Sequence, residues 1–156
     1  MHMKEISLNI WIQLVGMLTI VASLVFVGLE MRQSRSIALV NQIQERSYNV
    51  AAHINAYVES GQDWLGVQYP EARDTNLTQH QIMMRNTEAA GWFFFEADYF
   101  QYEQGLMTDE QWQAKLNTMV GNLLRCDTRD VYNIRITRIP AGMIELLSEY
   151  ELPQCN

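Results

Sequence analysis

Cysteine, proline, glycine and lysine are all scarce in this sequence, and the shortages exclude several classes of protein. The 156 residues include two cysteines, three prolines and eight glycines, while 48% of the residues are apolar. Collagen-like, low-complexity and disordered chains have a different composition. The two cysteines, Cys126 and Cys155, are too few for a disulfide scaffold and lack the Cys-x-x-Cys spacing of zinc and redox sites. We therefore expect both to be free thiols.

Basic residues are also few. The chain has 11 basic against 18 acidic side chains, for a formal charge of −7, and its only lysines are Lys4 and Lys115. Nucleic-acid binding needs clustered lysine and arginine to replace the counterions of the phosphates. The charge balance argues against a nucleic-acid partner, and the length fits one compact domain with little more than an added anchor.

Residues 10–29 form the longest apolar run, with no charged residue among 20. At about 1.5 Å per residue, a helix of this length covers roughly 30 Å, the thickness of the hydrocarbon core of a bilayer. A buried helix of a soluble domain is usually shorter, and a cleaved signal peptide would be followed by small residues rather than by GLEMRQSRS. We predict an uncleaved membrane helix, whose spanning residues include Ile10, Trp11, Gly16, Phe26 and Leu29.

The charges that flank this run predict its orientation. Lys4 is the basic side chain before it, whereas Arg32, Arg35 and Arg46 follow it. Positive flanks remain in the cytoplasm. We therefore expect a single-pass membrane protein, with an anchor in residues 1–36 and an acidic, cytoplasmic helical domain in residues 37–156.

Helix signals continue after the span. No glycine or proline interrupts residues 29–59, where apolar residues recur at helical spacing, so the membrane helix should continue to a glycine cap at Gly61. The apolar positions of this extension are Ile37, Val40, Ile43, Tyr48, Ala51, Ile54 and Val58. A loop is expected up to Leu77. Thr78 with Gln81 forms a capping-box pattern that opens a central helix over Thr78–Gln104. This helix carries apolar residues almost all the way round, which predicts burial on every side.

The remaining segments also predict helices. Thr108 and Gln111 repeat the capping-box pattern, and the buried face of that helix should consist of Trp112, Leu116, Met119, Val120, Leu123 and Leu124. A helix is preferred to a strand over about Thr128–Arg138, because no partner strand is apparent. Pro140 opens a last helix. The expected fold class is all-α: a membrane helix continuous with a long cytoplasmic helix, packed in a small helical bundle.

The central helix carries the main candidates for chemistry. Four charged residues share one of its faces, namely Arg85, Glu88, Glu96 and Glu103. Carboxylates that line a bundle can bind two iron ions, but such sites use Glu-x-x-His, and here the third residue after Glu88 is Gly91. We expect no metal and a Glu88–Arg85 ion pair. A candidate interaction or pocket face comprises Glu88, Trp92, Glu96, Tyr99 and Trp112.

Catalytic motifs are not apparent in the sequence. It has no GxSxG, GxxxxGK[ST] or GxGxxG pattern, and neither cysteine lies in a recognisable nucleophile turn. We predict a protein that is not an enzyme and has no cofactor. The aromatic residues of the central helix favour core packing, although an apolar cavity among Trp92, Phe93, Phe100 and Trp112 would suit a lipid or quinone.

Three segments carry a resemblance to a family. They are EMRQS at residues 30–34, FEADYFQYEQGL at residues 95–106 and DEQW at residues 109–112. In this order they resemble a group of uncharacterised bacterial single-pass membrane proteins with an FENxYxQYREGLL-like motif. The usual paired tryptophans of the C-terminal third are absent here. The resemblance implies an all-helical domain that is anchored in a bacterial inner (cytoplasmic) membrane, and it implies no activity.

Together these features predict a membrane-anchored, non-catalytic interaction protein that contacts the lipid bilayer. It would act as an accessory subunit or a self-associating scaffold of a membrane complex, with a protein partner or a second copy. The alternative is a sensory module that binds a small molecule, lipid or quinone.

Overall fold

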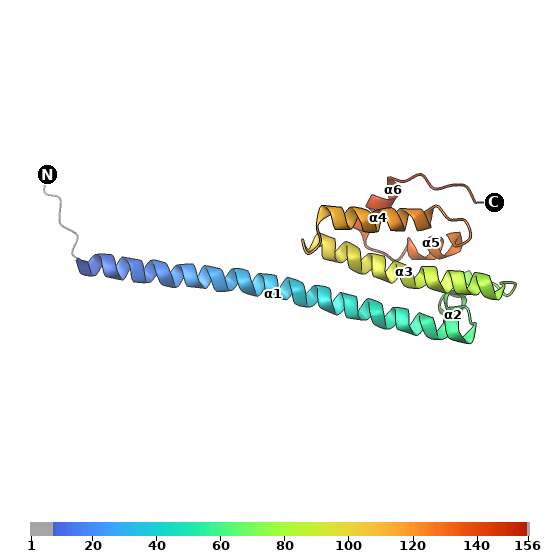
Figure 1. Ribbon diagram of the computed structural model, residues 1–156, viewed down its shortest axis with the longest axis horizontal. Coiled ribbons are helices and arrows are strands. Elements are labelled where there is room, and N and C mark those ends of the chain that lie inside the picture. Colours follow the sequence, from blue (N-terminus) through green and yellow to red (C-terminus); the bar gives the residue numbers. More distant parts are fainter. Residues whose placement is uncertain (1–7, 156) are drawn as a thin grey trace. The chain divides into compact units, whose positions relative to one another are not determined.

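The computed structural model describes residues 8–155 and is all-helical over that range, as predicted (Figure 1). It contains six α-helices and one 3-10 helix within these residues. Lys4, on which part of the predicted orientation depends, lies outside the described residues. The contacts divide the chain into two units, residues 1–39 and residues 40–156. Helix α1 (Leu8–Ser60) contributes to both.

The first unit consists of the N-terminal part of α1. All residues from Leu8 to Arg35 are exposed, including the predicted spanning residues Ile10, Trp11, Gly16, Phe26 and Leu29. The mean hydropathy of an 18-residue window of α1 is 2.3, and none of that window is buried. This helix is therefore long and apolar enough to cross a bilayer, and its apolar window is not covered by the rest of the described chain.

The second unit begins with the rest of α1, which buries Val40, Ser47, Ala51 and Ile54. Gly61 ends the helix with φ +67°, as predicted, in the left-handed region that favours glycine. The predicted apolar stripe is wrong at Ile37, which is 41% exposed, and at Tyr48, which is 57% exposed and belongs to this unit. Its ring instead contacts the ring of Phe94 on α3, with 5.4 Å between centroids.

The segment predicted to be a loop contains two short helices, α2 (Trp64–Gln68) and η1 (Pro70–Ala72). Asp63 caps α2 by accepting a hydrogen bond from the backbone N–H of Gly66 at 3.0 Å. Trp64 and Leu65 are buried in the core. Local sequence signals missed α2 because it is too short to show a period and is held by contacts with α3.

Helix α3 (Gln79–Glu103) begins with the predicted capping box of Thr78 and Gln81, and Gly105 follows its end with φ +68°. The prediction that α3 is buried on every side is wrong. Met83 and Phe94 are exposed, whereas Arg85, Asn86 and Glu88 are buried. Polar residues replace apolar ones on part of the inner face because they bind two other parts of the chain. One is the segment of residues 62–72, which contains α2 and η1 and is called the α2 segment below; the other is the chain that follows α4.

Helix α4 (Asp109–Leu123) has the predicted Thr108 capping box and packs beside α3. Its predicted buried face is confirmed at Trp112, Leu116, Met119 and Leu123, but Leu124 is 48% exposed because it lies beyond the last helical turn. The chain continues through α5 (Arg129–Arg135) and α6 (Ala141–Ser148), and Pro140 immediately precedes α6. In residues 128–138 the structure has a helix and no strand, as predicted.

The prediction of two free thiols is wrong. Cys126 and Cys155 form a disulfide, with a Cα–Cα distance of 5.3 Å. The two residues are 29 positions apart in the sequence. Spacing alone missed this bond because it depends on the C-terminal tail returning to the turn that follows α4.

Candidate functional site

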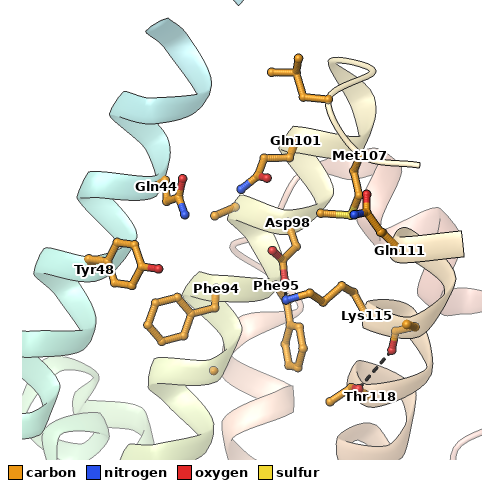
Figure 2. Close-up of a pocket in the computed structure, with 14 residues that line it drawn as sticks. Gln44, Tyr48, Phe94, Phe95, Asp98, Gln101, Met107, Gln111, Lys115 and Thr118 are labelled. Atoms are coloured by element: carbon orange, nitrogen blue, oxygen red, sulfur yellow. Dashed lines mark hydrogen bonds and ion pairs between the residues drawn. The ribbon is translucent and has the colours of Figure 1, made fainter. Parts of the chain in front are cut away.

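The second unit contains a groove lined by α1, α3 and α4, with a volume of about 910 Å³. Figure 2 shows Gln44 and Tyr48 of α1 facing Phe94 and Gln101 of α3, with Gln111 and Lys115 of α4 beyond them. Pockets that bind small molecules usually have volumes of about 300 to 1,000 Å³. The groove is therefore large enough for a ligand or for side chains of a partner.

The apolar part of the groove is mainly aromatic. Phe94 and Phe95 come from consecutive positions of α3, and Tyr48 lies across from Phe94. Phe94 is 36% exposed, so part of its ring is available for contact. Exposed aromatic rings gain free energy when a partner covers them. These residues give the groove an apolar floor.

The polar part of the groove is close to electrically neutral. Lys115 Nζ lies 3.1 Å from Asp98 Oδ2, so the two charges that line the groove neutralise each other (Figure 2). Gln44, Gln101 and Gln111 supply carboxamides, each of which both donates and accepts hydrogen bonds. The groove is suited to an uncharged polar group next to an apolar one.

The five residues predicted as an interaction face lie in separate clusters. Tyr99 and Trp112 are neighbours, with ring centroids 5.9 Å apart. Trp92 is buried, and the centroid of its ring lies 6.1 Å from that of Tyr132. Glu96 pairs with Arg135, and buried Glu88 interacts electrostatically with Arg125 and Asp127.

The four aromatic residues predicted to line one cavity are also divided. Phe93 and Phe100 line a smaller pocket of about 260 Å³, together with Glu96 and Arg46. Trp92 and Trp112 belong to the hydrophobic core. Sequence reasoning missed the larger groove because periodicity does not separate a partly exposed aromatic residue such as Phe94 from a buried one.

The predicted Glu88–Arg85 ion pair is wrong, because Arg85 interacts with three groups elsewhere in the chain. Its Nη1 lies 3.1 Å from Asp63 Oδ2, its Nε lies 2.7 Å from Asp130 Oδ2, and its Nη2 donates to the backbone oxygen of Ala72 at 2.8 Å. The two carboxylate contacts are ion pairs rather than well-aligned hydrogen bonds. Arg85 therefore joins α3 to the α2 segment and to α5.

Asn86 strengthens the same junction. Its Oδ1 accepts a hydrogen bond from the backbone N–H of Trp64 at 3.0 Å, and its Nδ2 donates to the backbone oxygen of Gln62 at 2.8 Å. Burial raises the pKa of the Asp63 carboxyl, and the charge of Arg85 opposes that rise. Arg85 and Asn86 are thus structural groups, which satisfy buried polar atoms that would otherwise be costly.

Because the carboxyl of Glu88 is buried, we expect the stability of the chain to depend on pH. Burial raises the pKa of its carboxyl, and the positive charge of Arg125 opposes the rise. Between the ordinary pKa and this higher folded-state pKa, the unfolded chain is ionised while the folded chain holds the proton. Stability contributed by this group is therefore present at low pH and is lost as the pH rises through that window.

We expect Glu88→Gln to reduce this loss and to make the chain at least as stable as the wild type at neutral pH. Denaturant titration of the full chain in detergent between pH 4 and 8 would measure it, with the exposed Glu45→Gln as the control. A Glu88→Gln chain that is less stable at neutral pH would contradict the prediction.

Within residues 8–155, no group of three or more histidine, cysteine, aspartate or glutamate side chains is arranged to hold a metal ion. Comparisons of the chain with protein-family models, curated proteins and solved structures found no match. The groove and the exposed part of α1 are therefore the features from which a function can be argued.

Proposed function

We propose that the chain is a single-pass, membrane-anchored, non-catalytic protein of a bacterial inner membrane, and that its helical unit binds a partner through the groove of α1, α3 and α4. The observation that carries the anchor is the uncovered apolar surface of α1. Exposing this apolar surface to water would cost about 25 cal/mol per Å², whereas the hydrocarbon core of a bilayer covers it without a protein partner. The resemblance of residues 30–34 and 95–106 to a single-pass membrane family supports the same proposal.

The partner we propose for the groove is an uncharged polypeptide segment, from an associated membrane protein or a second copy of this chain. Its apolar side chains would cover Phe94 and Tyr48, and its backbone amides would pair with the carboxamides of Gln44, Gln101 and Gln111. The internal Asp98–Lys115 pair gives no net charge to attract a strongly acidic or basic ligand. A lipid or quinone is the second candidate, because the groove volume also suits a small molecule.

Site-specific photocrosslinking in intact membranes tests both the membrane anchor and the binding of a partner in the groove. The full chain would carry photoreactive benzoylphenylalanine in place of Phe94, and membranes would be washed with alkaline carbonate before the adducts are weighed by mass spectrometry. We expect the chain to remain in the washed membranes and to form an adduct that contains a second polypeptide.

The matched control carries the same photoreactive residue at Met83, which is exposed on α3 but does not line the groove. An adduct that contains lipid or a small molecule would favour the second candidate. Equal adducts from both positions, or none, would contradict binding at the groove, and release of the chain by carbonate would contradict the anchor.

A further inference from the structure

The disulfide carries information about the side of the membrane on which the helical unit lies. Cys126 follows α4, and Cys155 lies in the tail that continues from α6 back toward the same end of the bundle (Figure 1). Both cysteines of the chain are used in this one bond. Their separation of 29 residues differs from the short Cys-x-x-Cys spacing of thiol oxidoreductases, so the bond is of the structural kind.

The bond also lies where solutes can reach it. Cys126 is exposed and Cys155 is half-buried. Glutathione and thioredoxin keep accessible protein thiols reduced in the cytosol, whereas disulfides persist in the periplasm and outside the cell. A buried disulfide would be shielded from these reductants, but this one is not.

The flanking arginines favour the opposite orientation, but only weakly. The difference is Arg32, Arg35 and Arg46 against Lys4. The positive-inside rule is reliable for loops shorter than roughly 60 residues, and longer domains cross the membrane largely regardless of charge. The chain after Leu29 is much longer than that limit. The disulfide is therefore the stronger indication.

We infer that the helical unit of residues 40–156 lies on the oxidising, non-cytoplasmic side of the membrane, with the N-terminal flank of α1 in the cytoplasm. This inference rests on the membrane anchor of the proposed function. It restricts the partner of the groove to polypeptides that expose a segment on that side. It also gives the disulfide a role, which is to hold the tail of residues 149–155 to the end of α4 outside the reach of cytosolic reductants.

The first test is the redox state of the full chain in living cells. Cells would be quenched with acid to stop thiol exchange, and free thiols would be labelled with polyethylene-glycol maleimide before and after reduction. We expect no added label before reduction and two labels after it. Two labels without reduction would overturn the inference.

The second test reads the side of the membrane directly. Cys155→Ser leaves Cys126 free, and a membrane-impermeant maleimide should label it in intact spheroplasts. The matched control is the Cys126→Ser/Cys155→Ser chain with Ser7→Cys, which should be labelled only after lysis. The reverse pattern would overturn the inference.

Carbonate extraction of the same samples separates the two proposals. A chain that carries the disulfide but is released from membranes would contradict the anchor and leave the oxidising compartment supported. A chain that stays in the membrane with two free thiols would contradict the compartment and leave the anchor supported.

Discussion

Replacing Arg85 with methionine is expected to lower the free energy of unfolding by about 3 to 5 kcal/mol, the usual effect of breaking a buried ion pair from one side. Methionine fills much of the same volume but leaves Asp63, whose side chain is only 13% exposed, without its positive partner. The backbone oxygen of Ala72 loses its donor as well. The α2 segment should then detach from α3 before the rest of the unit unfolds.

Denaturant titration of the full chain in detergent, followed by tryptophan fluorescence, would measure this effect because Trp64 lies in the affected segment. The control is Arg138→Met, since Arg138 pairs with Glu71 at an exposed position, where ion pairs contribute at most about 1 kcal/mol. Adding Asp63→Asn to Arg85→Met should recover part of the loss by removing the unpaired charge. Equal effects of Arg85→Met and Arg138→Met would contradict the proposed role of Arg85.

Lysine at position 85 would not restore the wild-type stability. The guanidinium of Arg85 reaches Asp63, Asp130 and Ala72 through different nitrogens, whereas an ammonium group is a single point of charge. The difference between Arg85→Lys and Arg85→Met therefore measures how much of the effect is charge alone.

Elements that are specified by neighbouring residues could be predicted from the sequence. The capping boxes at Thr78 and Thr108 are each completed within three residues, and Gly61 and Gly105 adopt the positive φ that glycine tolerates. The uncovered part of α1 could also be predicted, because the length and composition of the apolar run are properties of that segment alone. Signals of this kind do not depend on the rest of the fold.

Features that depend on distant residues could not be predicted. The helical i, i+3 rule paired Arg85 with Glu88, but Asp63 and Asp130 compete for the same guanidinium from other parts of the chain. The disulfide and the groove likewise appear only when α4, the tail and α1 are brought to α3. Phe94 is exposed and Trp92 is buried, although they are two positions apart on one helix. Which of the two lies in the core depends on the elements that pack against each of them.

Reducing the Cys126–Cys155 disulfide is expected to destabilise the full chain by about 3 to 4 kcal/mol, because the bond closes a loop of 29 residues and restricts the unfolded chain. For a chain of this size, such a loss lowers the midpoint of thermal unfolding by about 10 °C. Circular dichroism in detergent, with and without dithiothreitol, would measure the shift. The Cys126→Ser/Cys155→Ser chain should unfold at the lower temperature under both conditions.

Local effects distinguish the role of the tail from a general loss of stability. Leu152 packs against the core next to the disulfide, so reduction should increase amide hydrogen exchange in residues 149–155 first. The backbone amides around Arg85 should stay protected from hydrogen exchange under the same mild reduction, because the ion pairs of Arg85 with Asp63 and Asp130 do not depend on the disulfide. If dithiothreitol changes neither the midpoint nor the exchange of the tail, then the disulfide does not fix the tail to α4, and the physical reason to keep this domain in an oxidising compartment is lost.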